Sequence, residues 1–153
     1  MLFRSWVAET PGVYYYGRHG MPTTEALQQA IADLEGGHKA VVYPSGLAAC
    51  AGALLSCLAA GDHLLMTDTA YGPTRTFAKR VLGRYGVETT FYDPLVGAGI
   101  ADLMRPNTKA VFVESPGSLT FEMQDIPAIA EVAHARGAAV VMDNTWEIGR
   151  AHV

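Results

Sequence analysis

Short, almost wholly apolar runs alternate with segments of helical periodicity along this chain, and no other feature restricts its fold as strongly. Strands that are apolar on both faces need cover on both sides, which a parallel sheet obtains from the helices of its crossover connections. Residues 110–113 and 138–142 are such runs, and the segment 126–135 between them has helical spacing, with Asp125 before it and Gly137 after it. The sequence therefore predicts an α/β fold of three layers, in which a mostly parallel sheet is flanked by helices.

The same two periodicities predict the remaining elements. Apolar side chains at helical spacing predict helices over 22–35, 46–60, 73–85 and 100–104, and short β-rich runs predict strands over 40–43, 63–67 and 87–92. Open parallel sheets bind ligands beyond the carboxyl ends of their strands. The candidate site is therefore formed by the loops that follow the strands, at residues 44–46, 68–72, 114–118 and 143–145.

Charge and length favour one soluble unit with a small-molecule ligand. The chain has 153 residues, 50% of them hydrophobic, and a formal net charge of −4. No run of Lys or Arg is present, so a nucleic-acid or anionic membrane partner is not expected. The first residues lack the apolar region of an export signal, which predicts a cytoplasmic protein.

Cysteine and histidine usage gives no sign of a disulfide or a metal site. Cys50 and Cys57 are seven residues apart in a predicted helix, which separates them by about 10 Å and is too far for a disulfide. We read both as reduced core residues. The five histidines are scattered, without a Cys or His pair at metal-ligand spacing, and are predicted to be surface or capping groups.

Three loop features could serve a ligand at one sheet edge. The Ser-Gly-Leu-Ala-Ala sequence at 45–49 opens a helix, where backbone N–H groups could bind phosphate. Taken alone, this feature favours a plain N-cap role for Ser45 with small residues for close packing. Tyr71 could stack on a planar ligand or only pack in its turn. Asp143 could pair with a protonated ring nitrogen or only cap the next turn. Together a phosphate cradle, a stacking face and an acid are what pyridoxal phosphate requires.

A series of motifs extends this interpretation from about residue 12 to residue 146. The most specific motif is Glu-Ser-Pro-Gly-Ser-Leu-Thr-Phe-Glu at 114–122. The others are Tyr-Tyr-Tyr-Gly-Arg at 14–18 with Pro-Thr at 22–23, Leu-Glu-Gly-Gly at 34–37, Gly-Asp-His at 61–63, Tyr-Asp-Pro at 92–94, Pro-Asn-Thr-Lys at 106–109 and Asp-Asn-Thr-Trp at 143–146. In this order they resemble the N-terminal part of the catalytic domain of the bacterial cystathionine β-lyases, in the Cys/Met-metabolism branch of fold-type I pyridoxal phosphate enzymes.

The resemblance implies a role for each candidate residue. Gly46 and Leu47 would give backbone amides to the cofactor phosphate, Tyr71 would stack on its ring, and Asp143 would hold the pyridinium. Tyr16 and Arg18 would reach the phosphate of a neighbouring subunit, so that the site is shared across a dimer. The implied reaction is β-elimination of cystathionine to homocysteine, pyruvate and ammonia.

The sequence departs from this family in two respects. None of the three lysines, Lys39, Lys79 and Lys109, lies in the Thr-Lys motif that carries the Schiff-base lysine, so no catalytic residue is assigned here. Residues 147–153 also depart from the family and match the translation of a sequencing adapter.

We therefore divide the chain into an arm segment at 1–21, a partial cofactor-binding domain at 22–146 and a non-native tail at 147–153, with the C-terminal domain absent. The alternatives are a non-catalytic fragment with at most weak cofactor or phosphate binding, and a related γ-lyase or γ-synthase. Unpaired sheet edges in such a fragment predict insoluble expression.

Overall fold

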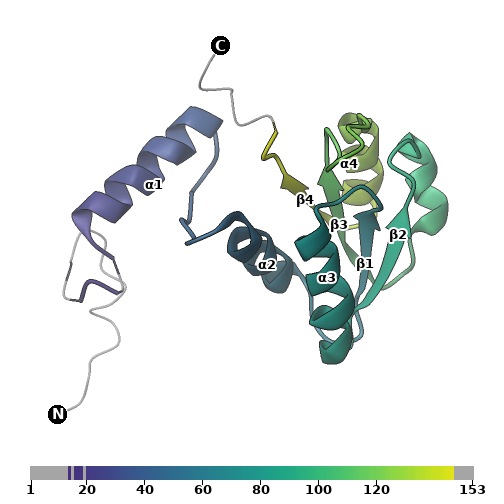
Figure 1. Ribbon diagram of the computed structural model, residues 1–153, viewed down its shortest axis with the longest axis horizontal. Helices are drawn as coiled ribbons and strands as arrows, with labels where there is room; N and C mark the ends of the chain where they lie inside the picture. Colours follow the sequence, from purple (N-terminus) through teal and green to yellow (C-terminus); the bar gives the residue numbers. More distant parts are fainter. Residues whose placement is uncertain (1–13, 15, 19, 147–153) are drawn as a thin grey trace. The chain divides into compact units, whose positions relative to one another are not determined.

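The computed structural model describes residues 14, 16–18 and 20–146 (Figure 1), and the chain divides into two compact units, with the boundary in the sequence between Val42 and Tyr43. The first unit contains helix α1, Pro22–Glu35, with the bounds that the sequence predicts. Proline occupies the first turn, where its missing N–H is not needed. Gly36 ends the helix in the left-handed conformation, with φ of 62°, which suits a residue without a Cβ.

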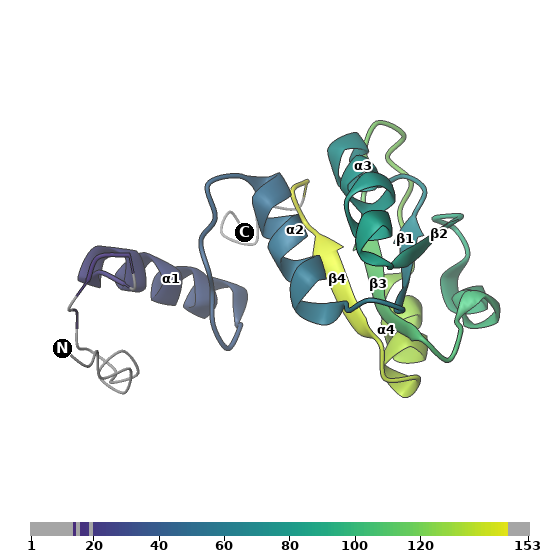
Figure 2. The same ribbon diagram turned by 90° about the horizontal axis from the view of Figure 1, so that it is seen from below.

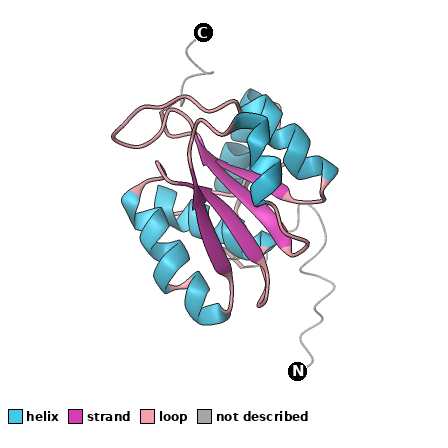
Figure 3. Cartoon of the chain, turned by 90° about the vertical axis from the view of Figure 1, so that its right-hand side faces the viewer, coloured by secondary structure: helices cyan, strands magenta, loops and turns pink. Residues whose placement is uncertain are grey.

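The second unit is a four-stranded sheet in the order β2-β1-β3-β4, with every pairing parallel (Figures 2 and 3). The strands are β1 His63–Thr67, β2 Glu88–Tyr92, β3 Thr108–Glu114 and β4 Ala139–Asp143. The helices are α2 Gly46–Cys57, α3 Gly72–Arg80 and α4 Ile126–Ala135, with 3-10 turns η2 Leu82–Tyr85 and η3 Gly97–Leu103. The predicted α/β fold with a parallel sheet is confirmed.

Alternate residues of the central strands point into two separate cores. On β3, Ala110 and Phe112 join the core beneath α2 and α3, which also contains Leu54 of α2. The intervening residues Val111 and Val113 join the core beneath α4, together with members such as Ile129. All of these side chains are fully buried. The three layers thus follow from strands that are apolar on both faces, with helices covering each face (Figure 3).

The prediction of a strand at 40–43 is wrong. These residues form no strand, and Val41 and Val42 are 62% and 39% exposed. A β-rich run needs a neighbouring strand to pair its backbone groups, and no strand within the described residues pairs with it. The loop from residue 44 therefore leads into α2 without ending a strand.

Two predicted helices are shorter in the structure. Helix α2 ends at Cys57, and Leu58 is extended. The Ala59 N–H donates to the Asp62 carboxylate at 2.7 Å, and this hydrogen bond takes the place of the one that a longer helix would make. The helix predicted over 73–85 divides into α3 and η2, with Val81 between them and Gly86 ending the turn at φ of 80°. A final 3-10 turn is common at a helix end. No helix of the described residues is long and apolar enough to cross a membrane.

One histidine contradicts the prediction that the histidines are surface or capping groups. His63, the first residue of β1, is fully buried. Its Nδ1 lies 2.8 Å from Thr108 Oγ1 on β3 and its Nε2 lies 2.9 Å from Thr90 Oγ1 on β2. The imidazole therefore bridges three strands. Burial, with the charge of Arg105 as the second cause, lowers the pKa of His63 from its ordinary 6.5, so the folded protein favours the neutral ring.

This histidine should make the fold acid-sensitive. Since the pKa of His63 is lower in the folded state, the unfolded chain takes up the proton first, and the stability that the neutral ring contributes above about pH 6.5 is lost as the pH falls. We expect urea unfolding midpoints to drop between about pH 7.5 and 5.5, and to drop less steeply for His63→Gln. His134→Gln, at the end of α4, should keep the wild-type slope. Equal slopes for wild type and His63→Gln would contradict the assignment.

Candidate functional site

The N-terminus of α2 presents two backbone N–H groups for an anion. The first four N–H groups of a helix lack acceptors within it. Ser45 satisfies two of them, because its Oγ accepts from the Ala48 N–H at 3.2 Å and its carbonyl accepts from the Ala49 N–H at 3.0 Å. Within the described part of the chain, the N–H groups of Gly46 and Leu47 remain for a ligand. The N-cap role of Ser45 and a phosphate cradle are therefore compatible.

Asp143 ends β4 with both carboxylate oxygens held by donors. Its Oδ1 accepts from the N–H and the hydroxyl of Thr145, at 3.1 and 2.5 Å. Its Oδ2 lies 3.6 Å from the Cys50 Sγ on α2, one helical turn beyond Gly46. Asp143 is therefore fixed beside the helix whose first turn presents the free N–H groups.

Glu114 connects the strand next to Asp143 with the loop of Tyr71. It is 2% exposed, and its Oε2 accepts from the Tyr71 backbone N–H at 2.8 Å. Burial, with the negative charge of Asp143 as a smaller cause, raises the pKa of Glu114, and the Tyr71 N–H opposes this. Tyr71 as a residue is 49% exposed, which leaves it accessible to a planar ligand.

Strand register brings these groups to one sheet edge. Glu114 and Asp143 are direct partners on adjacent parallel strands, which lie about 4.8 Å apart. Nearby on α3, the Thr74 hydroxyl is buried and has no hydrogen-bond partner among the described residues. Free N–H groups, an accessible aromatic ring and a held carboxylate fit the phosphate, ring and nitrogen of pyridoxal phosphate. The structure thus brings four of the six predicted cofactor residues to the same edge: Gly46, Leu47, Tyr71 and Asp143.

A tight loop at 117–122 borders the same edge. The Ser118 N–H donates to the Thr69 carbonyl at 2.8 Å, and a Cβ on Gly117 would lie 2.6 Å from the Thr69 side chain, so only glycine fits. Leu119 and Phe121 have positive φ values of 69° and 61°, which are uncommon for bulky residues. The loop is held in this shape by its contacts with the segment that follows β1.

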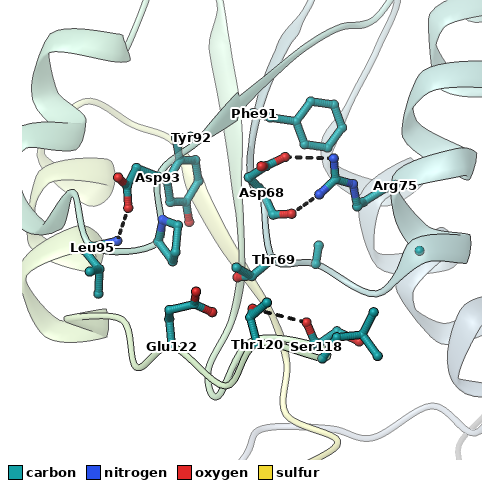
Figure 4. Close-up of a pocket in the computed structure, with 14 residues that line it drawn as sticks. Asp68, Thr69, Arg75, Phe91, Tyr92, Asp93, Leu95, Ser118, Thr120 and Glu122 are labelled. Carbon is teal, nitrogen blue, oxygen red and sulfur yellow. Dashed lines mark hydrogen bonds and ion pairs between the residues drawn. The ribbon is translucent and has the colours of Figure 1, made fainter.

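A cavity of about 860 Å³ opens beside this loop, at the carboxyl ends of β1 and β2 (Figure 4). One wall is Arg75, whose guanidinium pairs with Asp68 at 2.7 Å and lies 4.8 Å from the Phe91 ring centre. Opposite lies Glu122, of which Oε2 is buried and unpaired among the described residues (Figure 4). None of the predicted cofactor residues lines this cavity.

Tyr16 and Arg18 lie in the first unit, where the Arg18 guanidinium carbon is 5.2 Å from the centre of the Tyr16 ring. Their contact with a neighbouring subunit stays a prediction. The predictions for residues 1–13 and 147–153 concern residues outside the described part of the chain.

The lysines lie away from the candidate site or in the other unit. Lys109 is at the start of β3, five residues before Glu114, which is about 16 Å along a strand. Lys79 is in the last turn of α3, with Nζ 4.6 Å from the centre of the Phe91 ring. Lys39 belongs to the first unit. Within the described residues, moreover, no group of three or more His, Cys, Asp or Glu is placed to hold a metal ion.

Sequence reasoning missed two groups at the site. Glu114 appeared only as part of a motif, although an acid at the end of a fully apolar strand is a signal that could have singled it out. Cys50 was read as a core residue; it is free and partly buried, as that reading requires, but its contact with Asp143 joins residues 93 positions apart. A local sequence pattern does not predict such a contact.

Comparisons with known proteins agree on one family. The model of the family described as Cys/Met metabolism PLP-dependent enzyme matches residues 4–151. A putative cystathionine beta-lyase of Rhizobium johnstonii is 57% identical over 133 residues, which are 87% of this chain and 34% of that protein. The cystathionine beta-lyase of Salmonella typhimurium is 46% identical over 140 residues, 90% of this chain and 35% of that protein.

Two further relatives show the breadth of the similarity. An L-alanine/L-glutamate racemase of Wolbachia pipientis is 42% identical over 87% of this chain and 32% of that protein. The crystal structure of metB from Corynebacterium glutamicum superposes with a TM-score of 0.83 at 34% identity, over 88% of this chain and 35% of that chain. The chain thus spans about a third of the length of these relatives.

Proposed function

The chain belongs to the Cys/Met metabolism family of pyridoxal phosphate-dependent enzymes, and from this premise we propose that it forms the phosphate- and ring-binding part of a carbon–sulfur β-lyase that acts on cystathionine. The observation that carries the proposal is the placement of Asp143, Tyr71 and the free N–H groups of α2 at one sheet edge. The names of the relatives in Rhizobium and Salmonella support the β-lyase reaction and its substrate.

Each residue has a stated task in this proposal. The Gly46 and Leu47 N–H groups bind the cofactor phosphate at the positive end of the α2 dipole. Tyr71 covers one face of the ring, and the Asp143 carboxylate keeps the ring nitrogen protonated. When bound, pyridoxal phosphate supplies the electron sink that accepts the charge left by removal of the Cα proton.

Two further tasks fall to other residues. Tyr16 and Arg18 of one copy would bind the phosphate held by a second copy, where the planar guanidinium can pair with two oxygens at once. The reaction also needs a lysine that attaches the cofactor and moves the proton, and neither Lys109 nor Lys79 lies at the candidate site.

The racemase relative favours a second candidate, an amino-acid racemase built on the same cofactor contacts. Both reactions start with removal of a Cα proton, and the residues of this chain provide the cofactor contacts that either needs. The candidates differ in their products, because only the lyase releases pyruvate from cystathionine.

The proposal is tested first on the chain itself. Equilibrium dialysis should show binding of pyridoxal phosphate and much weaker binding of pyridoxal, which lacks the phosphate that the α2 amides hold. The chain alone should release no pyruvate from cystathionine, whereas the complete gene product should release it. Pyruvate release by the chain, or a complete product that only racemises alanine, would contradict the β-lyase proposal.

A further inference from the structure

The Asp143 carboxylate has one donor that comes from a distant part of the chain. Thr145 holds Oδ1 from the next turn, as a local cap does. The donor on Oδ2 is the Cys50 thiol, 3.6 Å away on α2. Since α2 also presents the N–H groups of Gly46 and Leu47, this contact sets the distance between the acid and the phosphate cradle.

Cys50 meets Asp143 as a thiol and not as a thiolate. Burial, followed by the charge of Asp143, raises the pKa of Cys50 to about 11. The neighbouring carboxylate of Glu114 adds to this. At neutral pH the sulfur therefore keeps its proton, and the S–H donates a hydrogen bond to the Asp143 oxygen.

We propose that Cys50 is a positioning residue, which fixes the Asp143 carboxylate relative to the N-terminus of α2 so that one cofactor can engage both. This inference rests on the proposed function, because it concerns the nitrogen and the phosphate of the same ligand. Removal of the thiol frees Oδ2 and lets the carboxylate turn about its bond to the backbone. Serine in place of cysteine keeps a donor at this position, and alanine does not.

The contact can be tested without any cofactor. In a Cys57→Ser background, Cys50 is the single thiol, and its alkylation by iodoacetamide at about pH 8 reports how much thiolate it forms. Asp143→Asn removes the negative charge, so alkylation should speed up about threefold or more. Glu131→Gln, on helix α4 that covers the other face of the sheet, serves as the control and should leave the rate unchanged. An unchanged rate in Asp143→Asn would overturn the contact.

The positioning role is tested by cofactor affinity. Cys50→Ala should raise the dissociation constant for pyridoxal phosphate by about three- to tenfold, and Cys50→Ser should restore it to within about twofold of the wild type. Urea unfolding midpoints of the two variants separate a general loss of structure from a loss of positioning, since rescue by serine at equal stability is expected. Equal affinity of Cys50→Ala and wild type overturns the role of Cys50 while the proposed function stands. Absence of binding in the wild-type chain overturns the proposed function, and the positioning role with it, whereas the alkylation result still decides the contact.

Discussion

Asp143→Asn should weaken the binding of pyridoxal phosphate to this chain by roughly 10- to 100-fold. The variant keeps the size of the side chain and removes its charge, and a hydrogen bond with a charged partner contributes about 1.5 to 3 kcal/mol. Thr145 donates a hydrogen bond to one carboxylate oxygen and Cys50 to the other, so the carboxylate is held in a fixed position. The ligand therefore binds next to a fixed negative charge. Equilibrium dialysis measures the change directly.

Asp68→Asn is the matched control for this experiment. Asp68 also follows a parallel strand at the same edge of the sheet, but its side chain is 59% exposed and pairs with Arg75. Loss of this exposed pair should cost little, because surface ion pairs contribute about 0 to 1 kcal/mol. Equal losses of affinity in the two variants would mean that general negative charge, and not the position of Asp143, serves the ligand.

Phe112→Ala should be the most destabilising single change in the second unit, with a cost of about 3 to 5 kcal/mol. Phe112 is fully buried in the middle of β3 and packs in the core beneath α2 and α3. The backbone at this position pairs with both β1 and β4, so the cavity left by alanine cannot close easily. Since domains of this size have only about 5 to 15 kcal/mol of stability, much of the total would be lost.

Urea titration followed by circular dichroism measures this effect. Tyr85→Ala removes the aromatic ring of a residue that is 69% exposed at the end of η2, and should stay within about 0.5 kcal/mol of the wild type. Similar losses for both variants would show that the face of the sheet beneath α2 and α3 is not packed in solution.

Elements with strong local signals could be predicted from the sequence. Helices α1 and α4 have the predicted bounds, because Pro22 and the Asp125 cap mark their starts and glycines follow their ends. Strand β3 was predicted as 110–113 and extends over Thr108–Glu114, since its apolar centre is visible and its polar ends are not. Local pattern therefore gives the type of each element better than its ends.

The failures arise where distant residues decide the outcome. The run at 40–43 has β-rich composition but no partner strand, and His63 is buried because Thr90 and Thr108 arrive from two other strands to satisfy both ring nitrogens. For the site, the loops after the strands directed attention to Asp143 and Tyr71. The contacts of Glu114 and Cys50 depend on strand register and helix placement, which no short stretch of sequence records.

Strand order also determines when the site can exist during synthesis. Among the described elements of the second unit, helix α2 is the first and β4 is the last, yet Cys50 and Asp143 are in contact. On a ribosome, β1 can pair with β2 and then β3 as each emerges, and β4 joins the outer edge of β3 only afterwards. Contacts over such long sequence separation form slowly, because the intervening loop must close first. A nascent chain halted before residue 143 would therefore have the free N–H groups of α2 without Asp143 beside that helix, and a ligand that binds both could help folding only after β4 has docked.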